Sequence, residues 1–335
     1  MSKFSIILPV RNGGEYIKEC INSILSQTFQ DFNLLVLENF STDGTVEWIE
    51  SLNDARIKII PAETPLSMDE NWGRIKDIPK NEFMTMIGYD DVLYPNYLEV
   101  ISGLIVKHPH ASLFQTHFHF IDSNGKIIRN CKLVKEVETV SQFLESICFN
   151  RTSIIGTGFM MRSFDYDSIG GIPMYPNLLF ADFELWLELT RIKYKATAPE
   201  TTFSYRVHSA STTSSSPFGK YVEGFDRLMK YFKKLTNTDP SVASFITANW
   251  IQFISYYCKG SAHKLLRTPI NKRDGVSVKT VLNKYIGYAN EFAPGKEYFP
   301  ARKFSIWLAL VIDSNIVTRN IYFIFKKIYP QPIYR

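Results

Sequence analysis

The first ninety residues alternate short apolar runs with amphipathic segments, and this alternation constrains the fold more than any other feature. Residues 4–10, 32–37 and 57–60 are apolar runs of strand length. Between them, residues 15–27 and 45–52 are predicted helices, the first with its apolar residues at helical spacing. Repeated strand–helix units of this length build a mostly parallel sheet flanked by helices, with right-handed connections. The sequence therefore predicts an α/β fold.

Two adjacent carboxylates follow the next predicted strand. Residues 83–87 are apolar and uncharged, which suits a strand buried on both faces, and Asp90 and Asp91 follow it closely. Ligands bind at the carboxyl ends of central strands in such sheets. Two anions ~4 Å apart repel by roughly 4 kcal/mol at an effective dielectric of about 20, and Mg²⁺ or Mn²⁺ carrying a substrate's phosphates would remove that repulsion. The alternative is that one aspartate caps the next helix, but that helix is expected to begin at Pro95.

Composition and charge narrow the class of protein. A chain of 335 residues is long enough for two domains, and 45% hydrophobic residues can build a large core. The four cysteines are widely spaced and no signal peptide opens the chain, which indicates reduced thiols in a cytoplasmic protein. The net charge of +5 matches the excess in residues 301–335, which hold six basic residues and one acid. This distribution argues against a nucleic-acid-binding face and indicates one local basic patch.

The opening third carries a set of motifs that together are specific. These are Pro9-Val10-Arg11-Asn12 after the first strand, Gln27-Thr28 after the first helix, and Glu38-Asn39-Phe40-Ser41-Thr42-Asp43-Gly44 after the second strand. The assembly resembles the nucleotide-binding start of family 2 glycosyltransferases, and the resemblance covers roughly residues 3–215. It implies the glycosyltransferase-A fold, with a Rossmann-like sheet, and a nucleotide-sugar donor bound by Pro9, Val10, Arg11 and Glu38.

Two positions in this region depart from the family pattern. Glu38 replaces the usual aspartate that accepts a hydrogen bond from uracil, so a uridine nucleotide is favoured. Phe40 stands where glycine is common, so a positive φ in the turn would be costly there. Asp43 is expected to be structural. Farther on, Arg74 lies in a segment that resembles the family's Asn-Trp-x-Arg helix. There it is expected either to reach the donor diphosphate or to be a solvated helix charge.

The aspartate pair matches the end of the family's Asp-x-Asp metal motif, with Gly88 in place of the leading acid. The resemblance implies that Asp91 binds Mn²⁺ or Mg²⁺ and that Asp90 contacts the donor ribose or the water shell of the metal. Tyr205-Arg206-Val207-His208 resembles a Tyr-Arg-x-His segment in which the histidine helps to hold the metal or the diphosphate. The Ser/Thr-rich run 209–216 is expected to be a loop that orders on donor binding, or a plain linker.

Asp182 is the candidate catalytic base. It lies in the first turn of a predicted helix, residues 180–191, off an apolar stripe formed by Phe183, Trp186, Leu187 and Thr190. The helix dipole at this point favours an ionised carboxylate, which a general base requires. A helix-capping role is the alternative from the residues alone. The segment resembles the family's acidic motif whose aspartate is the base, although Ala181 replaces the first acid.

The C-terminal part is predicted to be helical. We expect a catalytic domain over residues 1–216, with a nucleotide-sugar half to about 95 and an acceptor half to about 216, followed by a helical region over 217–335. Its basic, apolar tail is too often interrupted to span a membrane, which takes about 20 apolar residues. An amphipathic helix on an anionic membrane surface and a helix packed on protein remain open.

These observations predict an inverting enzyme, a hexosyl- or N-acetylhexosaminyltransferase. It would move a sugar from a nucleotide-sugar, with a UDP-sugar favoured, to a glycan or a polyprenyl-linked oligosaccharide. The resemblance places it in bacterial surface-polysaccharide assembly such as O-antigen, at the inner face of the cytoplasmic membrane. A non-catalytic nucleotide- or sugar-binding subunit is one alternative, because the leading Asp and the first acid at 181 are missing. A nucleotidyltransferase is another, although Asn12-Gly13-Gly14-Glu15 is a poor match for its phosphate loop.

Overall fold

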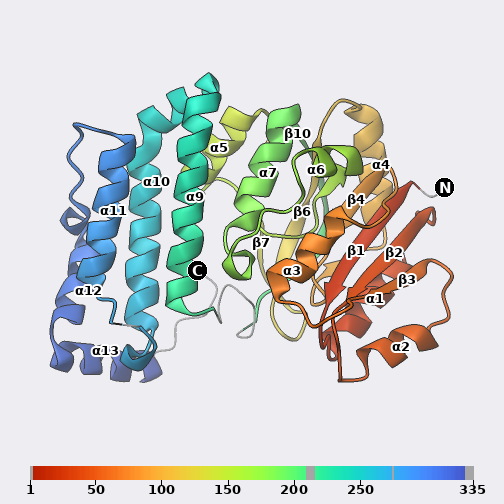
Figure 1. The fold of residues 1–335 in the computed structure, drawn as a ribbon, viewed down its shortest axis with the longest axis horizontal. Helices are drawn as coiled ribbons and strands as arrows, with labels where there is room; N and C mark the ends of the chain where they lie inside the picture. The colour runs from red at the N-terminus through yellow and green to blue at the C-terminus, as the bar shows by residue number, and fades with distance from the viewer. Residues whose placement is uncertain (1–2, 209–215, 274, 329–335) are drawn as a thin grey trace. The chain divides into compact units, whose positions relative to one another are not determined.

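The computed structural model describes residues 3–208, 216–273 and 275–328 (Figure 1). By contacts within the chain it divides into two compact units, Met1–Ser211 and Thr212–Arg335. All four cysteines fall within the described residues; each is buried and none forms a disulfide.

The first unit is built on one ten-stranded sheet. Eight of its strands follow in the order β3-β2-β1-β4-β9-β6-β10-β5, while β7 pairs with β6 and β8 pairs with β10. The pairs β3–β2, β2–β1, β1–β4 and β6–β10 are parallel, and β9 lies antiparallel between β4 and β6. The strands are β1 (Phe4–Val10), β2 (Phe32–Glu38), β3 (Ile57–Pro61), β4 (Phe83–Met86), β5 (Val92–Leu93), β6 (Leu113–Ile121), β7 (Ile127–Asn130), β8 (Val137–Glu138), β9 (Met160–Arg162) and β10 (Lys195–Arg206).

The predicted α/β fold is confirmed, and its centre is the part that the sequence marks most clearly. Every residue of β1 and β4 is buried, as expected for uncharged apolar runs in the middle of a sheet. Because β1, β2 and β4 are parallel, the residues that follow Val10, Glu38 and Met86 gather along one edge of the sheet. The candidate site residues of the first ninety positions lie along that edge.

Helices cover the sheet of the first unit. The predicted helices are present, but the helix that resembles the Asn-Trp-x-Arg segment is short and tightens into a 3₁₀ turn, η1 (Arg74–Lys76). Helices α5 and α6 and strands β5, β8 and β10 were not predicted. The α-helices are α1 (Tyr16–Leu25), α2 (Thr45–Ser51), α3 (Met68–Gly73), α4 (Tyr97–Lys107), α5 (Val140–Cys148), α6 (Ser163–Ser168) and α7 (Ala181–Ile192), with a 3₁₀ turn η2 (Pro176–Leu178) before α7.

Strand β10 matters most for the site. It is twelve residues long and runs parallel to β6, while its end pairs with β5, the two-residue strand that follows Asp91. Ser204 lies opposite Val92 in that pairing. The register therefore brings Tyr205 and Arg206 beside the aspartate pair, although more than a hundred residues separate them in the chain.

The second unit is helical, as predicted. Helices α9, α10 and α11 lie side by side around a core rich in aromatic side chains (Figure 1). This unit comprises α9 (Phe218–Thr238), α10 (Pro240–Arg267), α11 (Val278–Phe292), α12 (Phe304–Ser314) and α13 (Ile316–Ile328), with 3₁₀ turns η3 (Ile270–Lys272) and η4 (Pro300–Arg302).

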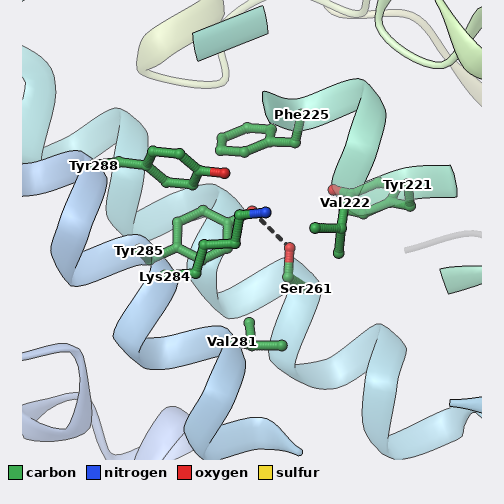
Figure 2. A pocket seen from close by; sticks show the side chains of 8 residues that line it. All are labelled: Tyr221, Val222, Phe225, Ser261, Val281, Lys284, Tyr285 and Tyr288. Carbon is green, nitrogen blue, oxygen red and sulfur yellow. Dashed lines mark hydrogen bonds between the residues drawn. The ribbon is translucent and has the colours of Figure 1, made fainter. Parts of the chain in front are cut away.

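A small cavity lies between α9, α10 and α11. The hydroxyl groups of Ser261 and Tyr285 are hydrogen-bonded at 2.7 Å at its wall (Figure 2). The cavity holds about 20 Å³, which is room for about one water molecule and too little for a sugar.

Candidate active site

The aspartate pair sits on a tight turn built around Gly88. The backbone N–H of Asp91 donates to the Gly88 carbonyl at 3.1 Å. A Cβ atom at position 88 would lie 2.8 Å from Asp90 Oδ1 and 3.1 Å from Asp91 Oδ2. Both carboxylates thus fold back over a residue that has no side chain. In the family's Asp-x-Asp motif, the side chain of the first aspartate would occupy the space that the two carboxylates fill here.

Asp91 is the buried member of the pair. Its side chain accepts a hydrogen bond from the Thr157 hydroxyl at 2.6 Å and another from the Arg206 backbone N–H at 3.0 Å. Only 1% of Asp91 is exposed, and burial followed by the nearby charge of Asp90 raises the pKa of its carboxyl well above the usual range. With each oxygen engaged by a donor inside the protein, Asp91 has the surroundings of a positioning residue rather than of an open metal ligand.

Asp90 and His208 are brought together. Asp90 Oδ2 lies 2.8 Å from His208 Nε2, and each side chain is partly exposed. The His208 ring also packs beside Tyr16, with 5.4 Å between ring centroids. Over the described residues, no group of three or more His, Cys, Asp or Glu side chains is arranged to hold a metal ion. Residues 209–215, part of the predicted loop, lie outside the described residues.

Arg206 ties this corner of the site to the rest of the unit. Its guanidinium is buried and donates to the Asp90 carbonyl at 2.7 Å, to the Asp122 carbonyl at 3.1 Å and to the Glu19 carboxylate on α1. It also lies over the Tyr16 ring, 4.7 Å from the centroid. A buried cation requires such partners. This role of Arg206 could not be predicted from the sequence, because Glu19 is 187 residues away; only its place in the Tyr-Arg-x-His motif marked it.

Glu38 holds the turn that follows β2. Its carboxylate accepts hydrogen bonds from the backbone N–H groups of Phe40 at 3.1 Å and Ser41 at 2.6 Å, and the residue is only 7% exposed. Phe40 adopts φ 56°, so the turn uses the positive φ that is costly for a residue with a side chain. The two bonds to Glu38 stabilise a conformation that is strained for a residue with a side chain.

Arg74 braces the carboxyl ends of β2 and β3. It donates to the carbonyls of Glu38 at 3.1 Å, Ile60 at 2.9 Å and Pro61 at 2.7 Å, and to the Asn71 side chain at 2.9 Å. These bonds occupy its two terminal nitrogens. In the structure the guanidinium is therefore neither the solvated charge nor the phosphate fork that the sequence suggested.

The segment after β1 forms a loop that is bonded to the turn after β2. Pro9 and Val10 are buried and Arg11 is exposed. The Gly14 N–H donates to Asp43 Oδ2 at 2.9 Å, and a hydrogen bond from the Thr45 hydroxyl is the main cause that lowers the pKa of Asp43. Asp43 therefore has the structural role expected of it.

Asp182 is the second residue of α7 and is partly exposed. Burial of its carboxylate among protein atoms raises its pKa to about 6, and backbone N–H bonds offset this only in part. The carboxylate is still mostly ionised at pH 7, although loss of hydration outweighs the effect of the helix start on its pKa. The preceding loop is strained, with positive φ at Asn177, Leu178 and Phe180.

Residues 155–158 connect α7 to the aspartate turn. The Trp186 indole donates to the Ile155 carbonyl at 2.9 Å, and a Cβ at Gly156 would lie 3.9 Å from that of Asp182. The next residue, Thr157, is the donor to Asp91. The predicted stripe of α7 is buried, with the Trp186 ring stacked on Phe159 at 4.5 Å. One short segment thus places the candidate base beside the metal motif.

Tyr205, at the end of β10, is within electrostatic range of all three candidate carboxylates. Burial raises the pKa of its hydroxyl, and the charges of Asp91, Asp90 and Asp182 raise it further.

Known proteins are similar to this chain in sequence and in fold. The family model "Glycosyl transferase family 2" matches residues 5–170. An uncharacterized glycosyltransferase of Rickettsia typhi is 24% identical over 77% of this chain and 80% of its own length. Another, of Haemophilus influenzae, is 25% identical over 63% of this chain and 67% of its own.

Two solved structures show the fold. S. aureus TarS 1–349 in complex with UDP-GlcNAc superposes with a TM-score of 0.67 at 15% identity, over 99% of this chain and 93% of that one. The mannosyltransferase PcManGT from Pyrobaculum calidifontis, with GDP-Man and Mn²⁺, gives 0.53 at 11% identity, over 99% and 88%. The predicted glycosyltransferase-A fold is confirmed. The matched motifs, the relatives and the fold show that this chain carries a glycosyl transferase family 2 domain over residues 5–170.

Proposed function

We propose that the chain is an inverting glycosyltransferase that moves a sugar from a nucleotide-sugar to a hydroxyl of a glycan acceptor in one displacement. The observation that carries this is the segment 155–158, which holds Asp182 on one side and Asp91 on the other. A base beside a carboxylate pair is the arrangement needed to activate an acceptor next to a donor diphosphate.

A UDP-sugar is the favoured donor, bound along the edge formed by Pro9, Val10, Arg11 and Glu38. TarS is a similar fold that was solved with UDP-GlcNAc and with UDP, whereas PcManGT was solved with GDP-Man. In this chain the Glu38 carboxylate already binds two backbone N–H groups. We propose that it accepts the uracil N–H with a remaining lone pair, and that Arg74 acts by fixing the edge rather than by touching phosphate.

The donor set at Asp90 and His208 fits Mn²⁺ or Mg²⁺ bound together with a diphosphate. A carboxylate oxygen and an imidazole nitrogen lie 2.8 Å apart with part of each exposed, and the described residues offer no third such ligand. Phosphate oxygens and water would complete the shell. We assign the ligand role to Asp90 and His208, with Asp91 positioning the turn. When bound, the ion would neutralise charge on the leaving diphosphate.

The protein's own groups supply the remaining chemistry. Asp182 takes the proton from the acceptor hydroxyl, whose oxygen attacks the anomeric carbon from the side opposite the leaving group. The bond to the diphosphate oxygen breaks as the new glycosidic bond forms, so the configuration inverts. No protein nucleophile is required.

The acceptor is proposed to be a glycan or a polyprenyl-linked oligosaccharide of a bacterial surface polysaccharide, handled by residues of about 96–216. The relatives are bacterial proteins called glycosyltransferases, which supports the setting in a general way. We also propose that the first unit has a nucleotide-sugar half up to about residue 95 and an acceptor half after it.

The test is nucleotide release from a panel of UDP- and GDP-sugars, with and without Mn²⁺, for wild type, Asp90→Asn and Asp182→Asn. Metal-dependent turnover of one UDP-sugar, lost in each variant, is expected. A chain that binds UDP but shows no turnover with any donor and a panel of glycan acceptors would be a non-catalytic binding subunit. Release of pyrophosphate from a nucleoside triphosphate and a sugar phosphate would instead identify a nucleotidyltransferase.

A further inference from the structure

Helix α12 has apolar residues on two opposite faces. Ile306, Ala309 and Asp313 form the face that is buried in the second unit. Phe304, Trp307, Leu308 and Val311 repeat at i, i+3, i+4 and i+7 on the outward side and are exposed. A helix that is apolar all round is normally buried on every side. The outward stripe of α12 is therefore suited to an apolar surface rather than to water.

Helix α13 also carries an exposed apolar stripe. Val317, Ile321, Ile324 and Ile328 repeat at i, i+4, i+7 and i+11 and are exposed, while Arg319 is only partly exposed and bonds to Asp313. The two helices pack on each other at a bend of 114°. We call the outward stripes of α12 and α13 together the tail surface.

The segment that carries the tail surface has basic side chains and a single acid. Asp313 is the only acid between residues 298 and 328. Its carboxylate is 3% exposed, pairs with Arg273 at 2.6 Å and accepts the Val278 N–H at 2.7 Å, so it contributes no negative charge outside. Arg302 and Lys303, at the start of α12, are exposed. The surface is thus apolar and basic, and it is complementary to a plane of anionic head groups over acyl chains.

We propose that the tail surface docks the protein on an anionic lipid surface, with α12 and α13 lying in the plane of the interface. The helices have 11 and 13 residues, and Trp307 is the kind of side chain that favours the head-group level. No single described helix is long and apolar enough to cross a membrane; the bent pair passes that test only when its two parts are taken together. This docking does not depend on the proposed transfer reaction, although it would bring the enzyme to a lipid-linked acceptor.

The experiment is sedimentation of the full chain with vesicles of phosphatidylcholine alone or mixed with phosphatidylglycerol. Ile321→Glu with Ile324→Glu removes the apolar stripe at positions that are 61% and 59% exposed, so folding is not at risk. The matched control is Leu133→Glu with Phe164→Glu, two exposed apolar residues of the first unit. A charge variant, Arg302→Gln with Lys303→Gln, is tested beside them.

Wild type and control are expected to sediment with the anionic vesicles at low salt, and the stripe variant is expected to stay in solution. The charge variant should bind roughly thirtyfold more weakly, because each basic residue near an anionic surface contributes about fivefold. Equal binding to neutral and anionic vesicles would overturn the proposal. So would wild-type protein that ignores vesicles but forms dimers that the stripe variant abolishes, or protein that resists extraction by alkaline carbonate, which would indicate insertion.

Discussion

The glycine at position 88 sets how close the aspartate pair comes to the backbone. Both carboxylates occupy the space in which a side chain at this position would begin. Asp91 cannot move easily, since two donors hold it, whereas Asp90 is partly exposed and bonds to His208. A side chain added at 88 would therefore displace Asp90 first.

Gly88→Ala is expected to disturb the Asp90–His208 contact while the unit stays folded. The added Cβ would meet Asp90 Oδ1 at 2.8 Å, a distance that forces a shift. UDP affinity measured by calorimetry should lose most of its dependence on Mn²⁺, and Gly103→Ala, where a Cβ meets nothing, should behave as wild type. Unchanged metal dependence in Gly88→Ala would show that the Asp90 geometry is not what the ion requires.

Asp182→Asn is expected to lower kcat by about 10²–10⁴-fold, the usual contribution of a general base. In wild type, burial raises the pKa of Asp182 to about 6, and only the ionised form accepts a proton. The logarithm of kcat/KM should therefore rise with unit slope as pH increases toward 6 and level off above it. Asp165→Asn, which alters another carboxyl whose pKa burial raises, is the control. A midpoint near pH 4 in the kcat/KM profile would contradict the burial of the Asp182 carboxylate.

The same raised pKa predicts that ionised Asp182, which is needed for catalysis, lowers the stability of the fold. The folded state disfavours the ionised carboxylate, so the cost is absent below the ordinary pKa of aspartate, develops as pH rises toward 6, and is complete above it. Asp182→Asn should thus melt at a higher temperature than wild type at pH 8, with the gap closing as pH falls below 6. A constant gap across this range would assign the difference to packing instead.

At the scale of elements, the turn after β2 stores strain beside the donor edge. Phe40 has φ 56°, which costs roughly 1–2 kcal/mol for a residue with a side chain. Phe40→Gly removes this cost. However, glycine loses more conformational entropy on folding, which destabilises the folded state by about 0.5–1 kcal/mol. The net gain in unfolding free energy should be about 0.5–1 kcal/mol by chemical denaturation. Phe40→Ala keeps the strain and should show no gain; equal gains would point to the aromatic ring as the cause.

The elements that were predictable from the sequence are those whose signal is local. The uncharged runs of β1 and β4 can only be buried strands, and the stripe of Phe183 and Trp186 can only face a core. Strand β10 was missed because Pro199, Glu200 and several threonines break its apolar pattern, although pairing with β6 on one side stabilises it. The prediction of strands failed where pairing with a distant strand, rather than local composition, determines that a strand forms.

The same limit applies to the site. Asp90, Asp182 and His208 could be named because motifs mark them, but the opposite burial of Asp90 and Asp91 could not, since neighbours in the chain carry the same charge. That difference arises from Thr157 and Arg206, which arrive from other elements. Arg74 was misread for a related reason: its partners are backbone carbonyls, which leave no mark in a sequence.

At the scale of the whole molecule, the second unit depends on one buried ion pair. Arg273 and Asp313 lie 2.6 Å apart with about 4% and 3% of their side chains exposed. Arg273→Met leaves the carboxylate without its main partner and should lower the stability of this unit by about 3–5 kcal/mol. Denaturant unfolding monitored by fluorescence would measure this loss. UDP binding would check that the first unit stays folded. Arg273→Met with Asp313→Asn should recover most of the loss; no recovery would mean that arginine packing, not charge, is responsible.

The close fit around Gly88 also bears on how such genes are sorted. A search pattern that demands an acid at this position would discard the sequence as a decayed enzyme, although the carboxylate in contact with His208 is retained. Because a side chain at 88 and the observed position of Asp90 compete for the same space, an acid at 88 would require Asp90 to move. The missing acid is therefore not by itself a sign of a broken site.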